Sequence, residues 1–88
     1  MARLAVSAAA WGQIRKDQRV NADPKAQVNP FPTMMIGLHG RAMSKVGGVG
    51  KILEPGQMVF VPAGTAHEAW NPFDEPAELI ILMFGEGA

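Results

Sequence analysis

The side chains with the clearest capacity for chemistry in this sequence are its two histidines, His39 and His67. An imidazole can gain or lose a proton near neutral pH, and it also binds metal ions. The chain has no cysteine, which excludes thiol nucleophiles, thiolate metal sites and disulfides. The chemistry left is hydrogen bonding, acid–base catalysis or metal binding by histidine, with carboxylates and amides as partners.

The segment around His67 has a distinctive spacing of glycine, proline, histidine and asparagine. Residues 56–71 read GQMVFVPAGTAHEAWN. Gly56 closes a turn before a predicted strand, and the Pro-Ala-Gly turn at 62–64 redirects the chain. His67 then begins the next predicted strand with its side chain pointing inward, and Asn71 ends that strand in a local turn.

This spacing resembles the second motif of the cupin superfamily, which reads Gly, five residues, Pro, one residue, Gly, two residues, His, three residues, Asn. Every fixed position is matched, by Gly56, Pro62, Gly64, His67 and Asn71. The resemblance covers residues 15–85 and implies a small single-domain cupin. Its fold would be an all-β jelly-roll barrel (a double-stranded β-helix) with His67 facing the interior.

The first cupin motif is matched in its spacing but not in its chemistry. In the family this motif supplies His-x-His and a Glu before a closing Gly, and those side chains join the second-motif His in binding a metal. With Gly40 as the closing glycine, the Glu position falls on Thr33. The resemblance therefore implies that the usual carboxylate ligand is missing.

The two histidine positions of the first motif depend on its register. The register we favour places Gln27 and Asn29 there, whereas a version longer by one residue places Ala26 and Val28 there. One imidazole with neutral amides is a poor ligand set for a divalent metal. We therefore predict a degraded metal site. In it His67, Gln27 and Asn29 hydrogen-bond a small molecule or hold a divalent metal weakly, and no other cofactor is expected.

The elements that must position these residues are short strands. Seven prolines and ten glycines interrupt the chain too often for a long helix. Residues 16–32 are predicted to be a long connection or a weak edge strand, and residues 1–88 to form one all-β domain. Strands are predicted over 5–10, 33–38, 41–46, 51–53, 57–61, 66–70 and 78–84, with glycine and proline turns between them, including one over 47–50.

Two of the predicted strands are apolar on both faces. Residues 58–61 and 79–84 contain no polar side chain, whereas an antiparallel strand with one face in water alternates. A short chain cannot cover both faces everywhere. We therefore expect a homodimer that shares a sheet face; the alternative is a tight sandwich with no partner.

Charge and hydropathy argue against several partners and locations. Eight basic and eight acidic residues balance, so neither nucleic acid nor a membrane surface is expected as a partner. All the Lys and Arg lie in residues 1–51 and six of the acids in residues 52–88, which predicts that strands from the two halves interleave. No segment approaches the roughly 18 apolar residues that span a bilayer. The Ala-rich start is interpreted as a strand rather than a signal peptide, and a cytoplasmic location is predicted.

Three kinds of function remain open, because a cupin fold alone does not choose among them. The favoured one is binding of a small polar molecule in the barrel, with hydrogen bonds from His67, Gln27 and Asn29 and apolar contact from Met, Phe and Trp. The alternative is a metal-dependent enzyme of the isomerase, lyase or oxygenase class, and the third is a structural domain whose interior is filled. No catalytic residue is assigned, since Glu68, the acid next to the motif histidine, is expected to point outward into solvent.

Overall fold

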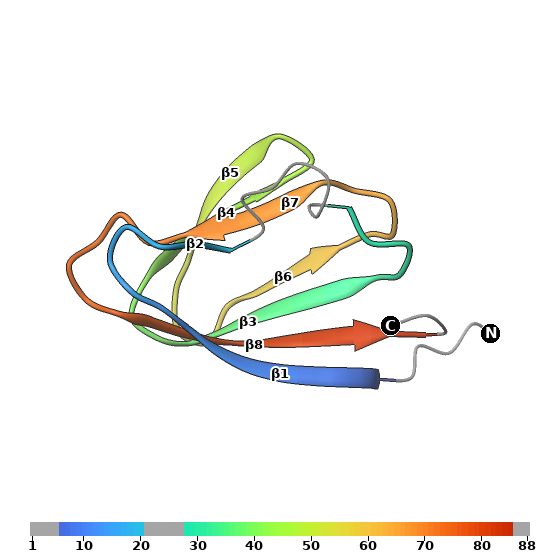
Figure 1. The fold of residues 1–88 in the computed structure, drawn as a ribbon, viewed down its shortest axis with the longest axis horizontal. Coiled ribbons are helices and arrows are strands. Elements are labelled where there is room, and N and C mark those ends of the chain that lie inside the picture. Colours follow the sequence, from blue (N-terminus) through green and yellow to red (C-terminus); the bar gives the residue numbers. More distant parts are fainter. Residues whose placement is uncertain (1–5, 21–27, 86–88) are drawn as a thin grey trace.

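The computed structural model describes residues 6–20 and 28–85 of the chain. These residues form eight β-strands, arranged as two four-stranded antiparallel sheets, and no helix (Figure 1). Accordingly, no helix able to cross a membrane occurs in these two ranges. The strands are β1 Val6–Ile14, β2 Arg19–Val20, β3 Thr33–His39, β4 Ala42–Val46, β5 Val49–Leu53, β6 Met58–Val61, β7 His67–Trp70 and β8 Ala77–Phe84.

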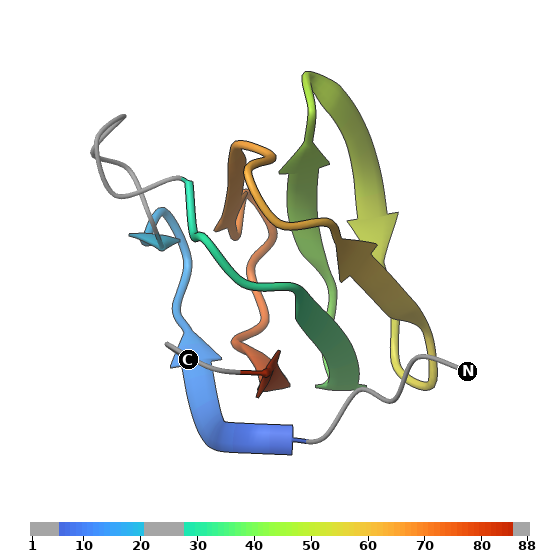
Figure 2. The same cartoon turned by 90° about the vertical axis from the view of Figure 1, so that its right-hand side faces the viewer.

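The two sheets form the two layers of a jelly roll. One sheet has the strand order β1-β8-β3-β6 and the other β2-β7-β4-β5. Because β3 and β4 lie in different sheets, as do β6 and β7, the chain passes repeatedly from one layer to the other (Figures 1 and 2). The predicted all-β jelly-roll architecture is confirmed.

The buried core explains why the sheets approach at one end and separate at the other (Figure 1). The core has two clusters of buried side chains, and the first consists of Ile14, Ala42, Ala69, Ala77 and Leu79. The three small alanines of this cluster allow a close approach of the sheets there. The second cluster consists of Met35, Leu53 and Val61, and Ile81 packs against both clusters.

The turn between β4 and β5 is shorter than the sequence predicted. Gly47 and Gly48 have φ values of 57° and 82°, a region that glycine enters without steric cost and that a two-residue hairpin turn requires. Val49 and Gly50, assigned to the turn from the sequence, instead begin β5 and pair with Val46 and Lys45.

The two halves of the chain interleave as the charge distribution predicted. β1 pairs with β8, and the connection that follows β1 contains the short edge strand β2, which pairs with β7. Lys16 forms an ion pair of 2.7 Å with Asp74, and Arg19 one of 3.3 Å with Glu68. Both ion pairs join a basic residue of the first half to an acidic residue of the second.

The outer surface of the β1-β8-β3-β6 sheet carries two apolar rows that cross all four strands. We call the eight residues of these two rows the outer apolar face. Trp11 is 62% exposed and Met58 60% exposed, so the described part of the chain leaves much of this face uncovered. One row is Trp11, Ile80, Ile36 and Met58, and the other is Ala9, Leu82, Met34 and Phe60.

Candidate functional site

A cavity of about 260 Å³ lies between the two sheets. Strands β3 and β8 form one wall, strands β2 and β7 form the other, and the segment before β3 contributes the rest. Most of the lining is apolar, with a few polar side chains among it. The lining residues are Val20, Asn29, Phe31, Thr33, Met35, His67, Glu68, Ala69, Leu79, Ile81 and Met83.

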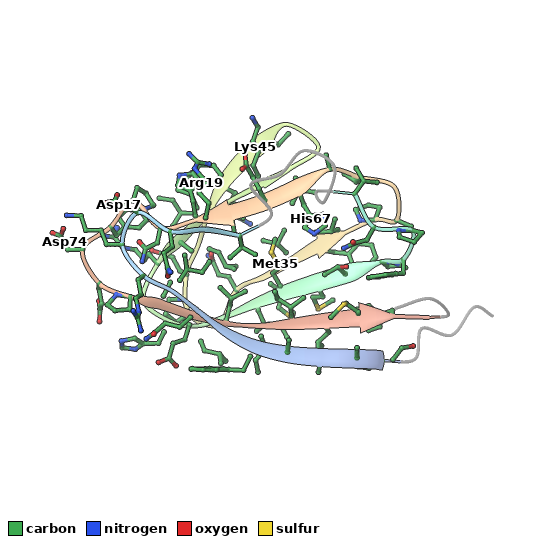
Figure 3. The ribbon with its side chains drawn as sticks, in the orientation of Figure 1. Asp17, Arg19, Met35, Lys45, His67 and Asp74 are labelled. Atoms are coloured by element: carbon green, nitrogen blue, oxygen red, sulfur yellow. The ribbon has the colours of Figure 1, made fainter. Side chains whose placement is uncertain are left out.

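His67 is the first residue of β7, and its side chain lines this cavity. The residue is 5% exposed, and in Figure 3 it lies between the sheets together with Met35. Its Nδ1 atom is 3.3 Å from the carbonyl oxygen of Thr65. A carbonyl can only accept, so Nδ1 carries the hydrogen and donates, which fixes the orientation of the ring.

Asn29 also lies on the cavity wall, held there by a glycine of the second motif. The Gly64 backbone N–H donates a hydrogen bond of 2.8 Å to the Asn29 carbonyl oxygen. The alternative register would use Val28, whose side chain is exposed, so the placement agrees with the register that selects Asn29. Gln27, the third predicted ligand-binding residue, lies outside the described residues.

Thr33 is a polar group of the cavity that the sequence did not assign to the site. It begins β3, where it is paired with Val61 on one side and Met83 on the other, and it is 2% exposed. Its Oγ1 atom has no hydrogen-bond partner among the described residues. The available signal was its alignment with the Glu position of the first cupin motif.

Glu68 was expected to point outward into solvent, but it is among the residues that line the cavity and its carboxylate is not solvated. Its side chain is 18% exposed, and Oε2 lies 3.3 Å from Nη1 of Arg19. The same guanidinium stacks 4.9 Å from the centre of the Trp70 ring. The carboxylate that neighbours the cavity is therefore already paired with a cation on the outer surface.

His39 takes no part in the cavity. Its side chain is exposed, and Nε2 lies 2.9 Å from Oε1 of Glu75 at the surface. This position agrees with the sequence, which placed His39 next to a glycine turn. Of the two imidazoles, only that of His67 reaches the interior.

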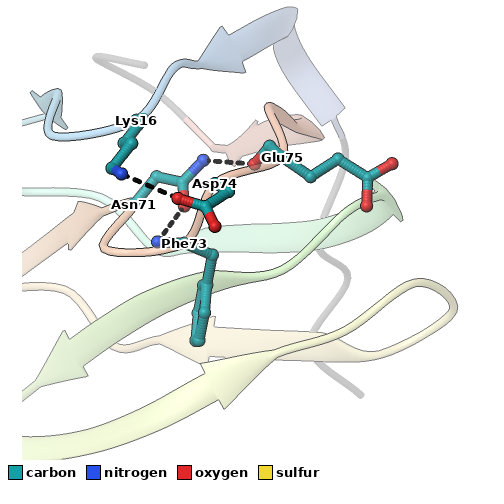
Figure 4. Close-up of polar contacts among 5 residues, drawn as sticks. All are labelled: Lys16, Asn71, Phe73, Asp74 and Glu75. Carbon is teal, nitrogen blue, oxygen red and sulfur yellow. Dashed lines mark hydrogen bonds and ion pairs between the residues drawn. The ribbon is translucent and has the colours of Figure 1, made fainter.

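Asn71, the last fixed position of the second motif, is fully buried and serves the architecture (Figure 4). Its Oδ1 atom accepts a hydrogen bond of 2.8 Å from the Phe73 backbone N–H, which is the local turn predicted from the sequence. Its Nδ2 group donates to the carbonyl oxygens of Ile14 and Glu75 at 2.9 and 2.8 Å. Figure 4 also shows the Lys16–Asp74 ion pair beside this turn.

The donors that face the cavity do not fit a resident divalent metal. His67 supplies an imidazole, Asn29 a neutral amide and Thr33 a neutral hydroxyl. The Glu68 carboxylate is engaged by Arg19. Within residues 6–20 and 28–85, three or more His, Cys, Asp or Glu side chains nowhere converge, whereas protein sites for transition metals use several such ligands.

Comparison with known proteins places this geometry in a family. The family model described as a cupin domain matches residues 20–83. No curated protein matches the chain.

Many solved structures have a similar fold. One is a cupin 2 conserved barrel domain protein from Salinispora arenicola CNS-205, with 19% identity and a TM-score of 0.75 over 89% of this chain and 62% of that one. Another is a predicted oxalate decarboxylase from Thermotoga maritima, with 14% identity and a TM-score of 0.77 over 86% and 64%. A third is the CENP-C cupin domain of Drosophila melanogaster, with 17% identity and a TM-score of 0.73 over 88% and 60%. This chain spans less than two thirds of each of these structures, and at such identities the likeness shows the fold alone.

Proposed function

Because the chain belongs to the cupin family, we propose that it is a binding domain for a small molecule that occupies the cavity between its sheets. The observation that carries the proposal is the cavity itself, with apolar walls and a few polar atoms. Small-molecule sites have this composition. Since an apolar cavity of about 150 Å³ holds benzene, a cavity of about 260 Å³ suits a ligand of roughly ten non-hydrogen atoms.

The proposed hydrogen-bonding residues are His67, Asn29 and Gln27. The imidazole of His67 is oriented by Thr65, so its ring meets a ligand in one fixed pose. Asn29 is held against the same cavity by Gly64. Gln27 enters the proposal from the motif spacing alone, since the favoured register pairs it with Asn29.

The cavity and its polar side chains also bear on the two other functions, a structural domain with a filled interior and a metal-dependent enzyme. A domain with a filled interior is disfavoured by the volume between the sheets. A metal-dependent isomerase, lyase or oxygenase would need ligands that the described lining does not bring together. The neighbours of this fold include both a predicted oxalate decarboxylase and CENP-C bound to CAL1, so the choice rests on the site rather than on the fold.

Methionine-methyl NMR tests the binding function directly. Met35 and Met83 line the cavity, whereas Met58 lies on the outer apolar face. A screen of compounds of about ten non-hydrogen atoms is expected to shift the signals of Met35 and Met83 but not that of Met58.

Two histidine variants separate cavity binding from other effects. His67→Ala is expected to weaken binding about tenfold, because a hydrogen bond inside a site is worth about 1 kcal/mol or more. His39→Ala, which removes the exposed imidazole, is expected to leave binding unchanged. Compounds that shift only Met58 would contradict the proposal, as would equal affinities for the two variants with both folded by circular dichroism. Stoichiometric metal that is lost in His67→Ala would favour the enzyme instead.

We also propose that the chain forms a homodimer through the outer apolar face. The two rows extend roughly 14 Å from β1 to β6 and lie about 7 Å apart at standard strand spacings, so they form the apolar centre of a larger interface, which in a stable dimer buries about 800 Å² of each partner. A second copy presents the same two uncharged rows, and two such sheet faces pack as the layers of a sandwich. A domain of this size is marginal alone, so the added burial contributes stability that a monomer lacks.

We propose a cytoplasmic location, and the balanced charge supports the absence of a nucleic-acid or membrane partner. Cell fractionation and a salt-dependent DNA-binding assay test it, since non-specific nucleic-acid binding depends steeply on salt. Recovery of the protein with membranes, or DNA binding that weakens with salt, would overturn it.

A further inference from the structure

We infer that the ligand of the cavity is a compact, uncharged and largely apolar molecule with a hydroxyl or carbonyl group, and that Thr33 Oγ1 is the hydrogen-bond partner of that group. The inference rests on the proposed binding function. It adds the chemical class of the ligand and a further binding residue.

The hydroxyl of Thr33 is an exception among the buried polar side chains of residues 6–20 and 28–85. Ser44 is equally buried, but its hydroxyl donates to the Lys51 carbonyl oxygen at 3.1 Å. Asn71 uses both its oxygen and its amide nitrogen within the protein. Buried polar side chains are nearly always hydrogen-bonded, so a buried Thr33 hydroxyl on a cavity wall with no described partner indicates a partner that occupies the cavity.

The backbone holds this hydroxyl in place. Thr33 lies in a strand that is paired on both sides, with β6 and with β8. A β-branched side chain has few rotamers, and both neighbouring strands restrict its movement toward solvent. The hydroxyl is therefore preorganised to meet a ligand group, and little side-chain entropy is lost on binding.

The charges around the cavity favour an uncharged ligand. No Lys or Arg is among its described lining residues, and the carboxylate of Glu68 is paired with Arg19. Burying an ionised group without a partner is costly. An anionic ligand would meet no Lys or Arg in the described lining, and a cationic ligand would have to break the Glu68–Arg19 pair.

The size and the apolar lining of the cavity indicate the chemistry of the ligand apart from its hydroxyl or carbonyl group. Apolar side chains such as Met35, Ile81 and Met83 surround the Thr33 side of the cavity, so most of the ligand surface is expected to be hydrocarbon. Three probes of similar shape separate the possibilities: 4-methylphenol has a hydroxyl, p-xylene lacks it, and 4-methylbenzoate carries a negative charge.

The test is a titration of the full chain with each probe at pH 7.5, followed through the methyl signals of Met35 and Met83. The wild type is expected to bind 4-methylphenol about fivefold more tightly than p-xylene, since one neutral hydrogen bond is worth about 1 kcal/mol, and 4-methylbenzoate more weakly than either. Tighter binding of 4-methylbenzoate would overturn the uncharged class.

Two substitutions test the role of Thr33. Thr33→Val keeps the shape of the side chain and removes the hydroxyl, so the preference for 4-methylphenol over p-xylene is expected to disappear. Thr33→Ser keeps the hydroxyl and is expected to retain the preference. An unchanged preference in Thr33→Val overturns the inference but leaves the binding cavity standing. Absence of binding by all three probes to the wild type would reject the inference together with the proposed function.

The stability of the ligand-free variant gives a second readout with a distinctive sign. Removing a buried hydroxyl that has no partner relieves an unfavourable term, so Thr33→Val is expected to melt about 4 °C or more above the wild type. A structural hydroxyl, or one bridged by a bound water, would give a lower melting temperature, and that result would count against the inference.

Discussion

The side-chain amide of Asn71 donates a hydrogen bond of 2.9 Å to the carbonyl oxygen of Ile14, and this bond joins the end of β7 in one sheet to the end of β1 in the other. The same side chain closes the turn to Phe73 and reaches the Glu75 carbonyl oxygen. One fixed residue of the second motif thus connects the two layers, whereas another, His67, lines the cavity.

Replacement of Asn71 by alanine is expected to lower the free energy of unfolding by about 2–4 kcal/mol, because three hydrogen bonds are lost and the carbonyl oxygen of the buried Ile14 loses its side-chain donor. Asn71→Asp is expected to be at least as destabilising, since its carboxylate would face the same two carbonyl oxygens. Urea denaturation measures both variants. A loss below 0.5 kcal/mol in Asn71→Ala, a margin typical of unimportant surface positions, would show that this amide does not join the sheets.

Two glycines flank Leu79 and are expected to respond in opposite ways to substitution by alanine. Gly12 of β1 and Gly37 of β3 both pair with Leu79 of β8. A Cβ on Gly37 would lie 2.4 Å from the Glu54 carbonyl oxygen, whereas a Cβ on Gly12 would meet nothing within 4 Å.

Gly37→Ala is therefore expected to destabilise the protein by about 1–3 kcal/mol, as overpacking against backbone does. Gly12→Ala is expected to be neutral or to stabilise by up to about 1 kcal/mol, because alanine loses less backbone entropy on folding. Thermal unfolding of the pair gives the comparison directly. Equal melting temperatures for the two variants would contradict the close approach of the turn after β5 to β3.

Local turn chemistry made the second half of the fold predictable from the sequence. Glycine and proline positions set where β6, β7 and β8 begin and end, and the motif spacing placed His67 on the inner side of β7. For the two-residue strand β2, the sequence predicted only that residues 16–32 form a long connection or a weak edge strand, without locating the strand within them. A strand so short is determined by its pairing with β7 rather than by its own residues.

The parts of the site that the sequence could not supply are tertiary. The Arg19 partner of Glu68 comes from a strand 49 residues away in the chain, so alternation alone predicted a solvated carboxylate. The unpartnered hydroxyl of Thr33 depends on what β6, β7 and β8 place around it. A motif alignment gives its position but not its surroundings.

The proposed homodimer predicts that charge on the outer apolar face will yield monomers. A Phe60→Lys, Met58→Lys double variant is expected to shift the chain from dimer to monomer in sedimentation equilibrium, because lysines on both copies would be buried against an uncharged face. Val49→Lys, on an exposed position of β5 outside this face, is the matched control and should remain dimeric. A wild-type chain that is monomeric at about 100 μM, well above the Kd of stable dimers, would overturn the proposal.

The backbone bond from Gly64 to Asn29 predicts a loss of binding that strain alone does not explain. Gly64 and Gly56 have similar positive φ values, 77° and 84°, and a Cβ on either would meet no atom within 4 Å. Alanine at each position should therefore cost about the same stability, roughly 1–2 kcal/mol for a left-handed residue. Alanine keeps the backbone N–H but must shift the backbone to relieve its positive φ, and at residue 64 that shift moves the N–H that holds Asn29, whereas the Gly56 N–H bonds to the Gly37 carbonyl oxygen. Gly64→Ala is therefore expected to weaken 4-methylphenol binding several-fold while Gly56→Ala leaves it unchanged. Equal affinities for the two variants in the methionine-methyl titration would mean that the position of Asn29 does not matter to the ligand.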